Sequence, residues 1–97
     1  MDGKIDKVRI DKWLWWARFF KTRSLSAKKI SNGAVKVNSF RVLKPSAEIT
    51  LNDVLTVKQG KTVRVIRVVS LGHKREKYDI AKEMYEDIVD INLDDST

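Results

Sequence analysis

Cationic and aromatic side chains are interspersed in one short stretch near the start of the chain, residues 9–24, which reads RIDKWLWWARFFKTRS. Five aromatic residues fall between positions 13 and 20, and five lysine or arginine residues lie among them or beside them. Ammonium and guanidinium groups bind phosphate oxygens, and aromatic rings stack on unpaired bases. The combination predicts a surface that contacts nucleic acid.

The candidate phosphate-binding side chains of this region are spread over two predicted helices and the link between them. They are Arg9, Lys12, Arg18, Lys21, Thr22, Arg23, Ser24 and Lys28. Ser24 is a good N-cap for the second helix, whose first backbone N–H groups would then face the same anion. The alternative is a solvated basic face without a ligand, which the convergence of the charges on the link disfavours.

Two of the rings, Trp15 and Phe19, lie four residues apart on the predicted first helix, opposite its apolar face. They either stack unpaired bases or are covered by another part of the chain. We favour a cover formed by the C-terminal helix, because its apolar stripe at Ile80, Met84 and Ile88 needs a partner.

The charge distribution points to the same class of ligand. The chain of 97 residues has a net charge of +7. Residues 1–78 carry 19 basic and 6 acidic side chains, whereas residues 79–97 carry Lys82 against 7 acids. A basic body with an acidic end is typical of proteins that bind a polyanion, and the charge favours nucleic acid over an anionic membrane.

Residues suited to catalysis are scarce, so we expect no enzyme, no metal and no cofactor. The chain has no cysteine, and its one histidine, His73, lies in a basic loop without a second histidine as partner. No glycine-rich phosphate loop is present. No apolar run is long enough to span a bilayer, and no secretory pattern is visible, so we expect a cytoplasmic protein without a membrane partner.

The apolar spacing predicts the elements that hold these residues. Ile10, Trp13, Leu14 and Ala17 fall on one face of a helix expected from Asp11 to about Phe20. A second helix, residues 24–32, ends at Gly33. Alternation at 35–37, a piece at 40–43, an extended residue at Ile49 and runs at 54–58 and 62–70 predict strands. A slip in the alternation at Val65-Ile66 suggests a bulge. From Tyr78, spacing through Ile91 predicts a terminal amphipathic helix before an acidic end.

Three motifs at fixed spacing resemble a known family. The chain contains R-I-D-x-x-L from Arg9, T-R at Thr22, and I-x-x-G-x-V-x-V-N from Ile30. Together they resemble the S-four-like RNA-binding domain family, and DKWLWWARFFKTRS with AKEMYED resembles its heat-shock protein fifteen type. The resemblance implies an α+β fold, with a two-helix RNA-binding motif packed on a small bent antiparallel sheet and a C-terminal helix in addition. It also adds Arg41 and Lys44, from the adjoining loop, to the RNA-binding residues.

The resemblance implies a function and a division of the chain. We expect a flexible lead-in at 1–8, the RNA-binding domain at 9–70, and an extension at 71–97. The family implies a non-catalytic factor that associates with ribosomal RNA of the large subunit and recycles free large subunits carrying a stalled nascent chain on tRNA. We expect a monomer. The alternative is a general binder of structured RNA or DNA without ribosome specificity.

Overall fold

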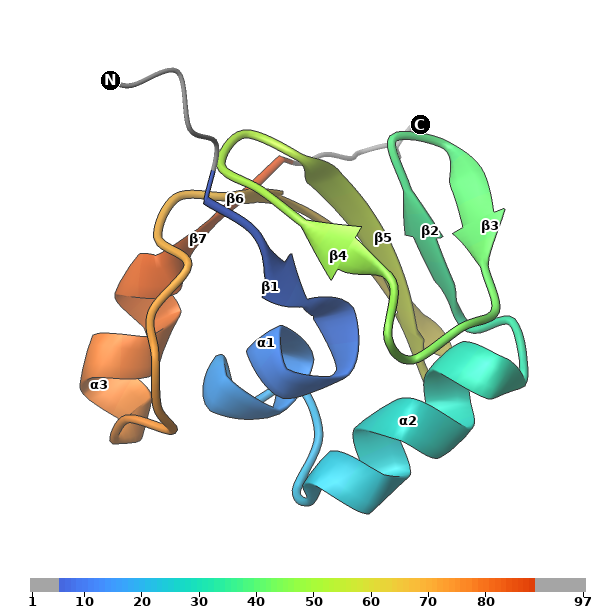
Figure 1. Cartoon of the computed structure of the whole chain (residues 1–97), viewed down its shortest axis with the longest axis horizontal. Coiled ribbons are helices and arrows are strands. Elements are labelled where there is room, and N and C mark those ends of the chain that lie inside the picture. Colours follow the sequence, from blue (N-terminus) through green and yellow to red (C-terminus); the bar gives the residue numbers. More distant parts are fainter. Residues whose placement is uncertain (1–5, 89–97) are drawn as a thin grey trace.

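The computed structural model describes residues 6–88 and confirms the α+β class. The helices are α1 (Ile10–Trp16), α2 (Arg23–Ser31) and α3 (Tyr78–Ala81), and a 3-10 turn, η1 (Lys82–Met84), follows α3. The strands are β1 (Val8–Arg9), β2 (Val35–Val37), β3 (Phe40–Val42), β4 (Glu48–Ile49), β5 (Val54–Gln59), β6 (Thr62–Val68) and β7 (Tyr85–Asp87). The first two helices lie together below the sheet, and α3 lies beside α1 at the end opposite β3 (Figure 1).

Five strands form one antiparallel sheet in the order β3-β2-β5-β6-β7, and β1 pairs separately with β4. Because successive side chains of a strand point to opposite faces, the register assigns each residue to a face. Val35 pairs with Val57 on the inner face, where both are buried. Lys36 pairs with Arg41 and with Thr56, so these three side chains share the outer face.

The core lies between α1 and the inner face of the sheet. The helical face predicted from the sequence is confirmed, because Ile10, Trp13, Leu14 and Ala17 are all at most 3% exposed. They join one buried cluster with the inner-face residues of β2, β5 and β6. The indole Nε1 of Trp13 donates to the carbonyl of Ser70 at 2.8 Å, which satisfies the polar atom of this buried ring.

Helix α1 is shorter than the sequence predicted. It ends at Trp16 rather than near Phe20, because Arg18 takes a left-handed conformation with a φ of 65°. The turn brings Phe19 and Phe20 back toward the core, and both are buried. The amide of Phe19 donates to the carbonyl of Leu14 at 2.9 Å, which closes the turn.

The predicted C-terminal helix is correct only in its first turn. Residues 78–81 are helical, but the chain then passes through η1 into β7. Strand β7 adds to the edge of the sheet, where Tyr85 pairs with Val68. The long-range pairing therefore overrides the helical spacing of Ile80, Met84 and Ile88. The rest of the predicted helix and the acidic end, residues 89–97, lie outside the described residues, as do residues 1–5 of the predicted lead-in.

The structure also differs from two smaller expectations. The predicted bulge at Val65-Ile66 is wrong, because β5 and β6 pair without interruption from Val54–Arg67 to Gln59–Thr62. Within the predicted lead-in, Val8 is already part of the fold, since it pairs with Ile49 in β1 and β4. Over the described part of the chain, no helix has the length and apolar character to cross a membrane.

Candidate nucleic-acid interface

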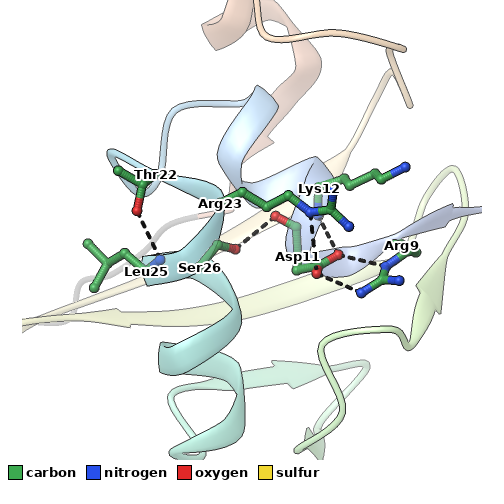
Figure 2. Close-up of polar contacts among 7 residues, drawn as sticks. All are labelled: Arg9, Asp11, Lys12, Thr22, Arg23, Leu25 and Ser26. Atoms are coloured by element: carbon green, nitrogen blue, oxygen red, sulfur yellow. Dashed lines mark hydrogen bonds and ion pairs between the residues drawn. The ribbon is translucent and has the colours of Figure 1, made fainter.

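A buried carboxylate organises the cations at the start of α1. The side chain of Asp11 accepts hydrogen bonds from Arg9 through Nε at 3.1 Å and Nη2 at 2.9 Å. It also accepts from the backbone N–H of Lys12 at 2.8 Å, and the Nε of Arg23 lies 3.7 Å away (Figure 2). We call Arg9, Asp11, Lys12 and Arg23 the Asp11 cluster.

The backbone brings the starts of two helices together at this cluster. The amides of Ile10 and Asp11 donate to the carbonyls of Ala47 and Pro45, at 2.7 and 3.2 Å, so the loop before β4 fixes the first turn of α1. The hydroxyl of the buried Ser26 donates to the carbonyl of Asp11 at 2.9 Å, which fastens α2 against α1 (Figure 2).

The N-cap of α2 is Thr22, not Ser24 as predicted. The Thr22 hydroxyl oxygen accepts from the amide of Leu25 at 3.0 Å, and the residue has an extended backbone. A threonine in this position satisfies one of the N–H groups left free at a helix start. Ser24 is therefore inside the first turn, as an exposed residue next to Arg23.

The cluster presents positive charge that is held in place. The side chains of Arg9 and Arg23 are 41% and 44% exposed, whereas that of Asp11 is 3% exposed. The hydrogen bonds to Asp11 raise the pKa of Arg9, although desolvation opposes them. A guanidinium has five N–H donors, so each arginine keeps donors that are not bonded to Asp11. This arrangement suits bidentate binding of phosphate oxygens.

The ten predicted interface residues do not all gather at one place. Four of them are exposed and lie close in sequence to the Asp11 cluster, on the segment between α1 and α2 or on α2 itself: Lys21, Thr22, Ser24 and Lys28. Lys44 is exposed at the start of the loop that holds α1. The other two, Arg18 and Arg41, lie elsewhere.

Arg18 faces the C-terminal extension. Its Nε donates to the carbonyl of Glu76 at 2.6 Å. Beside it, Arg75 donates to the carbonyls of Trp15 and Phe20, and its guanidinium lies 5.6 Å from the centre of the Trp15 ring. Burial and the charge of Arg18 lower the pKa of Arg75. Arg75 was missed in the sequence, because a cation in a loop gives no sign that it covers an indole.

Arg41 lies on the outer face of the sheet. Its Nη1 donates to the carbonyl of Gly33 at 2.5 Å, just past the C-terminal end of α2. The Asp11 cluster lies at the other end of that helix. Nine residues at 1.5 Å each separate the two ends by about 13 Å. Arg41 therefore belongs to a different surface from Arg23.

The rings of Trp15 and Phe19 have different surroundings. Phe19 is 5% exposed, and its ring centre lies 4.8 Å from that of Tyr85 in β7 and 6.0 Å from that of Trp13. The extension does cover Phe19, but through a strand instead of the predicted helix. Trp15 is only partly buried, under Arg75.

Arg64 completes the cover over Phe19. Its guanidinium lies 5.0 Å from the centre of the Phe19 ring and donates to Asp87 at 3.0 Å. Burial alone would lower the pKa of Arg64, but hydrogen bonds to Tyr85 and Asp87 outweigh it, and the pKa is raised. This arginine therefore remains charged and serves the packing of β7.

The groups around the Asp11 cluster are ones that can bind an anion. His73 is an exposed loop residue. Within residues 6–88, no three histidine, cysteine, aspartate or glutamate side chains gather in a way that could hold a metal ion. What the surface offers instead is a set of fixed guanidinium groups with exposed lysines and hydroxyl groups around them.

Comparison with known proteins identifies relatives of this chain. The S4 domain model matches residues 8–55. Heat shock protein 15 of Escherichia coli K12 is 42% identical over 81 residues, which cover 84% of this chain and 60% of that protein. The homologue from Aeromonas salmonicida is 40% identical over 81 residues. The chain thus spans about 60% of the length of these curated relatives.

Two further proteins are similar over most of this chain. A solved structure described as trimeric Vibrio cholerae heat shock protein 15 superposes with a TM-score of 0.81 at 35% identity, covering 86% of this chain and 83% of that one. The RQC P-site tRNA stabilizing factor of Streptococcus pneumoniae R6 is 27% identical over 89 residues, which cover 92% of this chain and 99% of that factor.

Proposed function

This chain belongs to the heat shock protein 15 family and carries its S4 domain, and we propose that it is a non-catalytic, ribosome-associated RNA-binding factor. The finer proposal is that it binds ribosomal RNA of the large subunit, in the cytoplasm, and acts on free large subunits that carry a stalled nascent chain on tRNA. The tRNA named for the Streptococcus pneumoniae relative supports this partner.

The observation that carries the proposal is the Asp11 cluster. Two guanidinium groups are bonded or paired to one buried carboxylate, so they are ordered before any ligand arrives. Side chains that are already ordered lose less conformational entropy on binding. Most contacts from such a surface are made to phosphate oxygens. These contacts fix the register of the protein on the RNA without reading its base sequence.

The test combines ribosome sedimentation with RNA titration. The variant Arg23→Ala with Lys21→Ala removes two cations and leaves the bonds between Arg9 and Asp11 in place. The matched control, Lys77→Ala with Lys82→Ala, removes the same charge near α3. We expect the first variant to lose about 1–3 kcal/mol of binding free energy to large-subunit RNA, as for other charge-assisted contacts. The control should bind like the unchanged protein.

The outcomes separate the proposals. Purified protein that sediments with large subunits, and loses this on Arg23→Ala with Lys21→Ala, supports the ribosomal function. Protein that stays at the top of the gradient yet binds RNA or DNA in titrations would indicate the general nucleic-acid binder instead. Unchanged ribosome association of the variant would contradict the proposed surface.

A further inference from the structure

A basic groove lies on the outer face of the sheet, away from the Asp11 cluster. Its volume is about 540 Å³. It is lined by the end of α2 and its turn, by β2, β3, β5 and the start of β6, and by the turn between β5 and β6. Its charged and polar lining residues are Lys29, Asn32, Lys36, Arg41, Thr56 and Lys58. We call it the outer-face groove.

The four cations of the groove have no acidic partner within it. None of its lining residues is an aspartate or a glutamate. Lys29 has a structural reason to be there, since a cation is favourable in the last turn of a helix. Lys36 and Lys58 have no such reason, because they project from the middle of β2 and from β5. A concave surface lined by charge of one sign concentrates its field and attracts counter-ions.

The backbone of the groove is shaped around Arg41. Gly33 has a φ of 84°, and a Cβ atom at this position would lie 3.1 Å from Nη1 of Arg41. The missing side chain therefore lets the guanidinium approach the Gly33 carbonyl at 2.5 Å. That bond uses one of the five donors of Arg41, so the others remain for a ligand.

Within residues 6–88, the outward positions of β2, β3, β5 and β6 carry cations but no rings. The outward residues of β2, β3, β5 and β6 in the register are lysine, arginine, threonine and valine. Sheet surfaces that read single-stranded RNA stack bases on aromatic side chains. This groove therefore has the means to hold a phosphate backbone, and its lining residues offer no ring on which a base could stack. A volume within the roughly 300–1,000 Å³ of small-ligand sites has room for more than one phosphate group.

We propose that the outer-face groove binds the phosphodiester backbone of a second RNA segment, while the Asp11 cluster holds the first. This inference rests on the proposed RNA-binding function and extends it to a second surface. Because the two sites lie at opposite ends of α2, one molecule can contact two segments or two faces of one folded RNA. Binding in the groove is independent of base sequence.

The first experiment removes cations from each surface in turn. Lys36→Ala with Lys58→Ala empties two positions of the groove and leaves Arg41 unchanged. We expect affinity for structured large-subunit RNA to fall about tenfold at low salt, and the slope of log affinity against log salt to become shallower by about 1 for each lost phosphate contact. Lys77→Ala with Lys82→Ala is the charge-matched control, and thermal melts check that each variant is folded.

The outcomes keep this inference apart from the proposed function. If the groove variant binds like the unchanged protein while Arg23→Ala with Lys21→Ala binds weakly, the groove inference fails and the RNA-binding function stands. If neither variant loses affinity, the Asp11 cluster is not the RNA-binding surface and the proposed function is contradicted. An equal loss in the control would show a general effect of net charge and would overturn the groove inference.

A second experiment identifies the ligand class. Amide NMR signals of Gly33, Thr56 and Gly60 are followed during titration with a uridine hexanucleotide, with uridine monophosphate and with polyglutamate. We expect the hexanucleotide to shift these signals at a concentration at least tenfold below that of the monophosphate. Equal effects of the two nucleotides would make the groove a mononucleotide site. A stronger effect of polyglutamate would assign it to an acidic protein, and either result would overturn the proposal.

Discussion

Asp11 is buried, yet the oxygen atoms of its carboxylate face cations that reach the surface. At the residue scale, this predicts a positioning role that can be told apart from a purely electrostatic one. If Asp11 acted only through its negative charge, its removal would strengthen the binding of a polyanion. If it positions Arg9 and Arg23, its removal weakens binding, although the net charge becomes more positive.

The substitution Asp11→Asn tests whether RNA binding weakens or strengthens when this negative charge is lost. The amide keeps the shape of the side chain but places a donor group opposite cationic donors. We expect the free energy of unfolding to fall by about 1–3 kcal/mol and RNA affinity to fall with it. Chemical denaturation and RNA titration measure the two effects. Asp79→Asn, in the first turn of α3, changes the charge equally at an exposed site. Tighter RNA binding by both variants would contradict the positioning role.

A second residue-scale prediction concerns two glycines with left-handed backbones. Gly33 and Gly60 have φ values of 84° and 60°, but only a Cβ at Gly33 would press on another residue, Arg41. An alanine in this conformation costs about 1–2 kcal/mol at either position. We expect Gly33→Ala to lose more stability than Gly60→Ala in chemical denaturation, because it also displaces the Arg41 guanidinium. Equal losses would show that Arg41 adapts at no cost.

At the element scale, β7 closes the core over Phe19. Tyr85 is the residue of β7 that contacts that ring, at a centre-to-centre distance of 4.8 Å. We expect Tyr85→Ala to lower the free energy of unfolding by about 2–3 kcal/mol, through lost apolar burial and the lost aromatic pair. Tyr78→Ala is the control, because Tyr78 is 65% exposed. Thermal melts of both proteins measure the difference, and similar losses would mean that β7 does not hold Phe19.

The elements show which features can be predicted from sequence and which cannot. The apolar face of α1 and the strands from β2 to β6 follow from local periodicity, and they were predicted nearly in place. The early end of α1 was not, because no glycine, asparagine or proline marks Arg18, which is held by its bond to Glu76 far along the chain. Strand β7 was missed for a related reason. Its conformation is set by pairing with β6, although the apolar spacing of the segment is that of a helix.

The candidate site shows the same limit. Eight of the ten interface residues were predicted from residue type and spacing, and Arg41 and Lys44 were added by the family resemblance; all ten were expected on one surface. The register of β2 with β3 sends Arg41 to the outer face, and an arginine in a short strand gives no sign of that choice. Lys36 and Lys58 were missed as groove residues because they lie 22 positions apart and meet only through the pairing of β2 with β5.

At the scale of the whole molecule, the number of cations that contact phosphate determines how binding responds to salt. If about five contacts form, log affinity falls against log salt with a slope of about −3 to −5, because each contact releases a condensed counter-ion. Fluorescence anisotropy with labelled RNA between 50 and 200 mM salt would measure this slope. A nearly flat response would show that the positive charge of the body does not drive binding.

The C-terminal extension is joined to the helical region by bonds that end on backbone carbonyls. Trp13 donates to the carbonyl of Ser70, the residue directly before the extension, Arg18 donates to that of Glu76, and Arg75 to those of Trp15 and Phe20. Every amino acid has a carbonyl, so the identities of residues 70 and 76 do not matter to this attachment. Selection can therefore differ between the residues that donate through a side chain and those that accept through the backbone. Neutral drift is expected at residues 70 and 76, and purifying selection at the tryptophan and the two arginines that donate.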